Sequence, residues 1–426
     1  MKILFVQGYL GKDEPPVFPL GLSRIAASIK GHSVAFFDPN LKEDYAAEFE
    51  DMLSRFLPHI VGISIRNIDS TNKRETVFYY KYLSEMIDIV KGILEDRVKI
   101  IVGGAGFSMF PQEIMEDETR IDYGVFLEGE QTLSKLLKNF DKPETIKGIF
   151  YRKNGRIRFT GHPEKPDMNE LPLPDRTGFS LSLYQNIPDA IGVETKRGCE
   201  FNCIYCIYGF LNGKQYRLIN PKRVVDDIES IAEKYGIKDF MFVDSVFNIP
   251  LSHAESICKE IIERGIDVSW SAWFHDKYLA DEFVQLVKEA GCNRIMLSPD
   301  ALSDEILKKL GKSQRKEDIL NTYNTLKRVD GIEICYNFFK NPPGQSILSF
   351  LRLLSFYIKA KIELRSRIHF EFNSMRIEPK TQLYEIALQK GIVERDTNLL
   401  YPRYYTNTAT SFIERIFNMM LRLKGA

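Results

Sequence analysis

The residues best suited to chemistry are three cysteines, Cys199, Cys203 and Cys206, which are spaced C-x3-C-x2-C. Thiolates this close together suit an iron–sulfur cluster or a zinc ion. Three thiolates can bind three irons of a four-iron cluster, and the fourth iron then stays open to a small molecule. A structural zinc ion requires a fourth protein ligand, and no histidine lies inside this loop. We therefore favour the cluster over a zinc site or three unrelated buried cysteines.

The segments that position these cysteines alternate between strand-like and helical composition from residue 190 onward. The strand candidates are short apolar runs rich in Val, Ile and Phe. Six units of this kind predict an open, partial β/α barrel whose active site lies at the carboxyl ends of its strands. The cysteines directly follow the first strand. The six strands are expected at 190–198, 239–246, 267–274, 294–300, 333–339 and 367–377.

A C-x3-C-x-aromatic-C motif after the first strand of such a barrel resembles the radical S-adenosylmethionine (SAM) superfamily. The resemblance implies a [4Fe–4S] cluster on the three cysteines, with SAM bound to the open iron through its amino and carboxylate groups. An electron from the cluster can then cleave SAM to a 5′-deoxyadenosyl radical. Tyr205 matches the aromatic position near the adenine.

Other barrel segments extend this resemblance and imply further SAM-binding residues. The segment 239–248 looks like the family's second-strand element, and 294–319 looks like its fourth strand and following turn. The segment 337–346 resembles the fifth-strand G-x-P-G-E-T element, although Gln345 replaces its acidic residue. Each implied residue is also an ordinary strand-end or turn residue. They are Asp244, Asn248, Ser298, Asp300, Lys312, Pro343 and Gly344.

The first part of the chain also alternates strands and helices. Strands are expected at 2–8, 33–38, 59–65, 99–104 and 123–129, with helices at 20–30, 42–56, 75–94 and 130–139. This alternation predicts a parallel sheet with helices on both faces, in a doubly wound, flavodoxin- or Rossmann-like order. Ligands of such domains lie beyond the carboxyl ends of the strands.

These patterns give an α/β fold in four parts. Asn154-Gly155 predicts a β-hairpin within 148–159, and five of the nineteen prolines lie in 161–190. We expect a doubly wound domain at 1–145, a hairpin and proline-rich linker at 146–190, the partial barrel at 191–377 and a helical segment at 378–426.

A doubly wound domain before this kind of barrel resembles the cobalamin-binding subgroup of the superfamily. The segments 18–38, 100–114 and 126–133 look like the subgroup's conserved elements. Glycines let a backbone approach a large flat ligand closely, and a helix amino terminus binds the oxygens of a nucleotide tail. The same glycines also suit tight strand-to-helix turns. The implied cobalamin-binding residues are Gly103, Gly104, Gly106, Glu128 and Gly129.

One departure concerns the ligand beneath the cobalt. The chain lacks the D-x-H-x-x-G motif whose histidine ligates cobalt in many cobalamin domains, and reads Ser64-Ile65-Arg66-Asn67-Ile68-Asp69 at that point. This loop resembles the tryptophan 2-C-methyltransferase type, in which an arginine faces the cobalt. Ser64, Arg66 and Asn67 are therefore implied at the cofactor. A cation there would favour Co(I) and discourage a lower ligand. The alternative for Arg66 is an ion pair with Asp69 or with a nearby glutamate.

The resemblance implies a methyltransferase that moves a methyl group from SAM through Co(I) and methylcobalamin to a substrate carbon. Strand alternation places His369, Glu371 and Asn373 on one face of the sixth barrel strand, and Trp273 and His275 on one face of the third. Barrel strands are usually apolar on both faces, so these rows are expected to line the site. Glu371 or His275 is the candidate base that removes a substrate proton.

Three alternatives remain open at this point. A radical SAM oxidoreductase or cyclase keeps the fold without methyl transfer. A methylthiotransferase would need three further cysteines for a second cluster, which residues 1–145 lack. A non-catalytic iron–sulfur protein would not need a barrel that binds SAM.

Composition adds expectations about partners and location. The 426-residue chain has 58 basic and 58 acidic side chains, which argues against electrostatic binding of nucleic acid. No apolar run reaches the roughly 18–20 residues that span a membrane, and the amino terminus does not read as a signal peptide. We expect a cytoplasmic protein with a small-molecule or peptide substrate and an electron donor of the flavodoxin or ferredoxin type.

Overall fold

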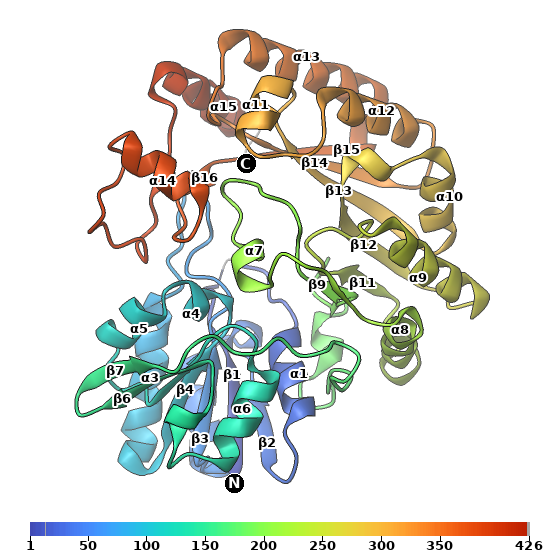
Figure 1. Ribbon diagram of the computed structural model, residues 1–426. Helices are drawn as coiled ribbons and strands as arrows, with labels where there is room; N and C mark the ends of the chain where they lie inside the picture. Colours follow the sequence, from blue (N-terminus) through green and yellow to red (C-terminus); the bar gives the residue numbers. More distant parts are fainter. Residues whose placement is uncertain (13, 424–426) are drawn as a thin grey trace. The chain divides into compact units, whose positions relative to one another are not determined.

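The computed structural model describes residues 1–12 and 14–423, which divide into two compact units. Unit 1 comprises 1–70 and 75–192, and unit 2 comprises 71–74 and 193–426. Each unit contains one large sheet (Figure 1). The segment 146–190, expected as a separate hairpin and linker, therefore lies within unit 1.

Unit 1 has a seven-stranded sheet in the order β2-β1-β3-β4-β5-β6-β7. Its first five strands are parallel, in the 2-1-3-4-5 order of flavodoxin-like domains. The predicted hairpin pairs antiparallel with β5 and extends the sheet. The strands are β1 (Lys2–Gln7), β2 (Ser33–Phe37), β3 (Ile60–Ser64), β4 (Lys99–Gly103), β5 (Tyr123–Val125), β6 (Ile149–Lys153) and β7 (Arg156–Phe159).

The helices of unit 1 pack as two pairs, α1 with α6 and α2 with α3. Asp44 begins α2 by accepting a hydrogen bond from the Ala47 amide. The sequence did not predict α4 and α5, which follow the glycine-rich turn after β4. The helices are α1 (Leu20–Ser28), α2 (Tyr45–Phe56), α3 (Lys81–Leu94), α4 (Ala105–Met109), α5 (Pro111–Asp117) and α6 (Gly129–Lys138).

Unit 2 has a six-stranded sheet in the order β15-β14-β13-β12-β11-β8. The pairs from β11 to β15 are parallel. The expected open six-stranded barrel architecture is confirmed. The strands are β8 (Gly192–Val193), β11 (Asp239–Phe242), β12 (Ser269–Phe274), β13 (Cys292–Asp300), β14 (Glu333–Phe339) and β15 (Ile368–Asn373).

Helices cover the outer face of this sheet (Figure 1). Helix α8 has strong ends, because Asn220 caps its start, Pro221 fills the first turn and Gly236 ends it in a left-handed conformation. The helices are α7 (Tyr208–Leu211), α8 (Pro221–Tyr235), α9 (Leu251–Glu263), α10 (Asp281–Glu289), α11 (Asp304–Lys309), α12 (Lys316–Lys327) and α13 (Ile347–Leu364).

Two small antiparallel pairs complete unit 2. The pair β9 (Lys196–Arg197) and β10 (Arg217–Leu218) closes the cysteine loop, and the pair β16 (Met375–Arg376) and β17 (Tyr404–Tyr405) follows the barrel. The expected first and sixth strands are thus each split by a short break. The final segment contains α14 (Gln382–Gln389) and α15 (Ser411–Leu423), as the predicted helical segment requires.

Candidate active site

The three cysteines lie in a loop between β9 and β10. Cys199 donates its amide hydrogen to the Gly213 carbonyl at 2.9 Å. Gly198 has φ +107°, and a Cβ there would lie 2.1 Å from the Gln215 carbonyl oxygen. Only glycine fits, so the chain can close this loop directly before the first cysteine.

The three thiols form no disulfide, and burial governs the protonation of Cys203 and Cys206. Burial raises the pKa of Cys203, and it raises the pKa of Cys206 to about 12, with the neighbouring thiols acting in the same direction. These groups are therefore neutral thiols near pH 7 unless a metal replaces the proton. Three convergent thiols are the right donors for an iron–sulfur cluster.

The described residues contain no group of three His, Cys, Asp or Glu side chains arranged to hold one metal ion. A structural zinc site brings its ligands around a single ion. In a four-iron cluster each cysteine binds a different iron, so the sulfurs are spread more widely. The three thiols are suitable donors for the cluster, and their loop supplies no histidine as a fourth ligand for zinc.

Tyr205, Asp300 and Lys312 lie together beside the cysteine loop. Tyr205 donates its hydroxyl hydrogen to the Asp300 carboxylate, which also pairs with Lys312. The Lys312 ammonium donates to the Ser298 carbonyl at 2.7 Å and lies 5.6 Å from the Tyr205 ring centre. Four residues expected at SAM, from the cysteine loop and the segment 294–319, are thus in one cluster. Its contacts to SAM stay a prediction.

Asp244 and Asn248 are occupied by protein partners. Asp244 accepts hydrogen bonds from the Thr195 amide at 2.9 Å and from the Lys196 ammonium at 2.9 Å. The Lys196 and Asp244 side chains are each only 1% exposed. Asn248 donates to the His275 carbonyl at 2.9 Å and accepts from the His275 amide at 2.8 Å. These contacts brace the strand ends around the cysteine loop.

His275 lies just beyond β12, with both ring nitrogens bonded. Nδ1 accepts from the Lys277 amide at 3.2 Å, so Nε2 carries the hydrogen and donates it to the Ser313 hydroxyl at 2.8 Å. The ring stacks on Phe201 of the cysteine loop at 4.8 Å. Burial lowers the pKa of His275 to about 4. The structure therefore gives His275 the contacts of a positioning residue.

The predicted polar row of β15 has the expected alternation. Phe370 packs outward against Phe356 of α13, at 6.0 Å between ring centres. Glu371 points to the other face, where it is exposed and aligned with Asn337 of β14. Asn373 donates to the Asn337 side-chain oxygen at 3.2 Å. Glu371 is therefore a carboxylate on the inner face of the sheet, where a base for the reaction is expected.

Pro343 and Gly344 form the turn after β14. Gly344 has φ +86°, and a Cβ there would lie 2.7 Å from the Lys309 side chain. Gln345 closes the turn through its amide, which donates to the Pro342 carbonyl at 3.0 Å. These contacts hold the turn against α11. A contact between the turn and SAM stays a prediction.

In unit 1 the candidate cobalamin residues lie at the carboxyl ends of β3 and β4. The Ile65 amide donates to the Gly103 carbonyl at 2.8 Å, and the Gly106 amide donates to the Ile65 carbonyl at 2.9 Å. A Cβ on Gly104 would lie 2.4 Å from the Ile65 oxygen. These glycines therefore allow two loops to pack backbone against backbone.

That packing presents Arg66 and Asn67, which are exposed, at the carboxyl edge, while Ser64 is half-buried. Among the described residues Arg66 makes no ion pair, so the alternative pair with Asp69 does not form. Glu128 immediately precedes α6. A Cβ added to Gly129, the first residue of α6, would lie 3.0 Å from the Ile25 side chain. Leu127 between these segments donates its amide hydrogen to Ser108 at 2.8 Å.

The described loops at this edge fit cobalamin bound without a histidine beneath the metal. His32 and His59 lie at the amino ends of β2 and β3, the opposite edge. His162 contacts Phe126 and Phe159 in the hairpin region. The loops 64–67 and 103–106 contain no histidine, and the exposed Arg66 lies in the first of them.

Sequence reasoning missed several residues that shape the site. Thr195, Lys196 and Ser313 tie down the strand ends, and Gly311 holds the cysteine loop. Gly311 has φ +71°, and a Cβ there would lie 2.3 Å from the Asn202 carbonyl oxygen. The sequence signal for this contact is the glycine between Leu310 and Lys312. A local pattern does not reveal that this glycine contacts a loop distant in the sequence.

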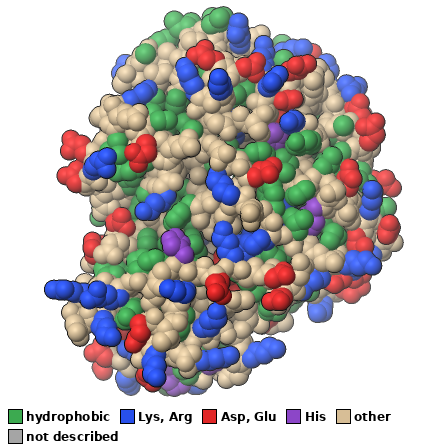
Figure 2. Space-filling view, viewed as in Figure 1, with side chains coloured by type: hydrophobic (Ala, Val, Ile, Leu, Met, Phe, Trp, Pro, Cys, Tyr) green, Lys and Arg blue, Asp and Glu red, His purple; other side chains and the backbone are tan. Residues whose placement is uncertain are grey.

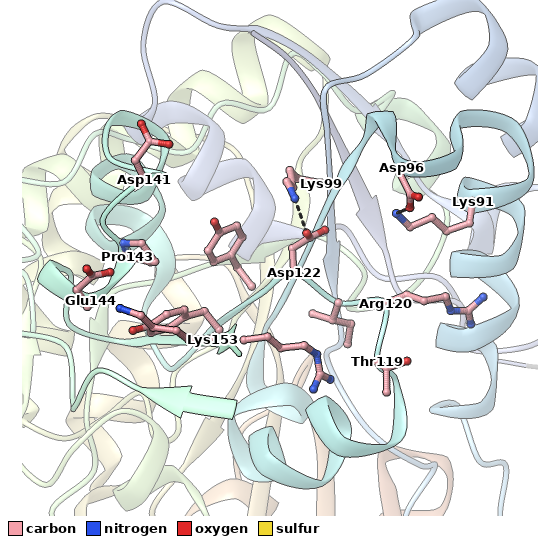
Figure 3. Close-up of a pocket in the computed structure, with 14 residues that line it drawn as sticks. Lys91, Asp96, Lys99, Thr119, Arg120, Asp122, Asp141, Pro143, Glu144 and Lys153 are labelled. Atoms are coloured by element: carbon pink, nitrogen blue, oxygen red, sulfur yellow. Dashed lines mark hydrogen bonds and ion pairs between the residues drawn. The ribbon is translucent and has the colours of Figure 1, made fainter. Parts of the chain in front are cut away.

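A cavity of about 510 Å³ in unit 1 lies away from this chemistry (Figure 3). It lies at the amino ends of β4 and β5, and many of its charges pair with one another. Lys99 bonds Asp122 at 2.7 Å, and Lys91 lies 3.4 Å from Asp96. The size of this cavity is therefore not evidence that it has a function.

The surface charge and the hydropathy of the helices agree with the expectations from the sequence. Figure 2 shows basic and acidic side chains interspersed over the visible face. Within the described part of the chain, no helix has the length and apolar character that crossing a bilayer requires.

Two family models match the chain. The B12 binding domain matches residues 6–137, and the radical SAM superfamily matches residues 193–356. The first match begins near the end of β1 and contains all of β2 to β5, and the second contains β11 to β14 of the barrel sheet.

Several curated proteins are similar over most of the chain. An uncharacterised methyltransferase of Pyrococcus horikoshii is 26% identical, over 88% of this chain and 79% of its own length. A putative methylthiotransferase of Methanocaldococcus jannaschii is 24% identical, over 75% and 69%. An anaerobic magnesium-protoporphyrin IX monomethyl ester cyclase of Rubrivivax gelatinosus is 26% identical, over 77% and 59%.

Among solved structures, the radical SAM methyltransferase TsrM of Kitasatospora setae, bound to tryptophan and a SAM analogue, has the same fold. The TM-score is 0.80 at 23% identity, and the match covers 92% of this chain and 77% of that one. The predicted fold class is confirmed.

Proposed function

Because the chain joins a B12 binding domain to a radical SAM domain and so belongs to the cobalamin-dependent radical SAM enzymes, we propose that it transfers a methyl group from SAM to a carbon of its substrate. SAM, a [4Fe–4S] cluster and cobalamin are its cofactors. When bound, SAM is the methyl source, cobalamin is the methyl carrier, and the cluster anchors SAM. The substrate is a small molecule or peptide.

The observation that carries this proposal is the pair of sites at the carboxyl ends of the two sheets. Cys199, Cys203 and Cys206 would hold the cluster, and the Tyr205–Asp300–Lys312 cluster beside them would bind SAM. Lys312 brings a buried positive charge that suits the SAM carboxylate. In unit 1, Arg66 would face the corrin without coordinating the metal.

The chain also supplies a group for the proton that a carbon substrate must lose. The Glu371 carboxylate is exposed on the inner face of the barrel sheet. It would take the proton at a carboxylate oxygen as the methyl group bonds to carbon. His275 would keep the cysteine loop and the end of β12 in place.

A radical SAM cyclase or oxidoreductase is the second candidate, because the similar proteins include the cyclase of Rubrivivax gelatinosus. A methylthiotransferase is disfavoured, since its second cluster needs three more cysteines. The described cysteines outside the loop, Cys258, Cys292 and Cys335, lie within unit 2 on a helix and two strands.

Products of SAM distinguish the two candidates. The reduced, fully loaded enzyme is incubated with SAM and small-molecule extract, and the products are quantified by mass spectrometry. Methyl transfer predicts S-adenosylhomocysteine and an acceptor that gains one methyl group. Formation of 5′-deoxyadenosine with no S-adenosylhomocysteine would contradict it and favour the cyclase.

A further inference from the structure

A polar cavity of about 430 Å³ lies in unit 2, at the point where the chain leaves β14 and β15. Lys340 directly follows β14, and Ser374 directly follows β15. Helix α15 forms another wall, packed on the barrel through Phe417 and Phe372 at 4.6 Å. The cavity therefore lies at the strand ends where barrels of this class bind ligands, apart from the cysteine loop.

Positive charge dominates this cavity. Four cationic side chains and one carboxylate line it, namely Lys73, Arg74, Lys340, Arg415 and Glu414. Counted over these five side chains, the formal charge is +3. Glu414 is already neutralised, because it accepts from Lys73 at 2.9 Å and from the Ser374 hydroxyl at 3.2 Å. A cation would find no open carboxylate among these residues.

Lys340 is the residue that most requires a ligand. It is 6% exposed, and its ammonium has one hydrogen-bond partner among the described residues, the Asn418 side-chain oxygen at 3.1 Å. An ammonium has three hydrogens to donate, and a buried charge without a counter-charge is costly. Burial lowers the pKa of Lys340, and Arg74 and Lys73 lower it further while Glu414 opposes them.

We propose that this cavity binds an anionic group, a phosphate or a carboxylate, held by Lys340 with Arg74 and Arg415. The anion would accept the remaining Lys340 hydrogens and balance the excess charge. Arg415 is exposed at the rim, so it would attract the anion and contact its outer oxygens. This anion site would exist whether or not the enzyme transfers a methyl group.

The test uses the full-length enzyme loaded with its cluster, cobalamin and S-adenosylhomocysteine, so that the cofactor sites are filled. Inorganic phosphate, pyrophosphate and succinate are titrated in separate calorimetry experiments. We expect one anion per chain, and the preferred probe identifies phosphate or carboxylate as the group. A Kd on the order of micromolar would show that the free anion is itself the ligand. A saturable Kd on the order of millimolar would identify the anchoring group of a larger ligand.

Variants locate the binding. Lys340→Gln should raise Kd at least about tenfold, and Lys340→Arg should retain most of the affinity. Lys259→Gln, an exposed lysine on α9, is the charge-matched control and should leave Kd unchanged. If Lys340→Gln does not fold, the rim variant Arg415→Gln should still weaken binding several-fold. No saturable binding of any probe, or equal Kd in Lys340→Gln and the unaltered enzyme, would overturn the proposal.

Discussion

At the scale of single residues, the proposed base Glu371 makes the most specific claim. Its carboxylate is exposed on the inner sheet face, next to Asn337. Glu371→Gln keeps the size and removes the proton acceptor. We expect substrate methylation to fall by about 10²–10⁴-fold, while methylation of cobalamin by SAM continues. Stopped-flow spectra of the cofactor and product quantification measure the two steps separately.

The matched control for that change is Glu333→Gln. Glu333 is an exposed carboxylate at the first position of β14, which places it at the opposite end of the barrel from the cysteine loop. It should leave both steps unchanged. Unchanged turnover in Glu371→Gln would show that this carboxylate is not the base.

At the scale of elements, the buried Lys196–Asp244 pair holds β9 to the end of β11. Both side chains are 1% exposed, so Asp244→Asn leaves a buried ammonium without its counter-charge. We expect a loss of about 3–5 kcal/mol in the free energy of unfolding. The exposed pair Lys238–Asp267 is the comparison, because Asp267→Asn should cost at most about 1 kcal/mol. Denaturant unfolding of both variants measures the difference, and equal costs would remove the bracing role of Asp244.

Gly311 tests whether a distant turn holds the cysteine loop. Gly311→Ala would place a Cβ 2.3 Å from the Asn202 carbonyl oxygen, whereas Gly236→Ala, at nearly the same φ, meets nothing within 4 Å. Both variants carry a similar backbone cost of roughly 1 kcal/mol. Only Gly311→Ala should lose bound iron, measured by metal analysis after anaerobic reconstitution. Full iron content in that variant would contradict the proposed role of the turn in holding the cysteine loop.

The sequence predicts much of this arrangement, because local patterns determine it. Apolar runs located most of the strands, and the cysteine spacing located the metal loop. What it missed depends on contacts between distant segments. The bonds from Thr195 and Lys196 to Asp244 are one example, and the contact of Asp244 with SAM stays a prediction. The hairpin at 148–159 was expected in a linker, yet its pairing with β5 places it in the sheet. No residue pattern specifies which sheet edge a hairpin joins.

At the scale of the whole molecule, the account assigns one cofactor site to each unit. The cysteine loop in unit 2 and the Arg66 loop in unit 1 each lie at the carboxyl edge of a parallel sheet. Methyl transfer requires both cofactors, whereas a simple radical SAM oxidoreductase requires only the cluster. Cofactor stoichiometry therefore tests the central claim before any substrate is known.

The most direct measurement is iron and cobalt analysis of the anaerobically purified chain after cluster reconstitution, hydroxocobalamin addition and desalting. The ultraviolet–visible spectrum recorded with it identifies the cofactor forms. We expect about four irons and about one cobalt per chain. Iron without cobalt would contradict the cobalamin assignment and make unit 1 a substrate or partner domain.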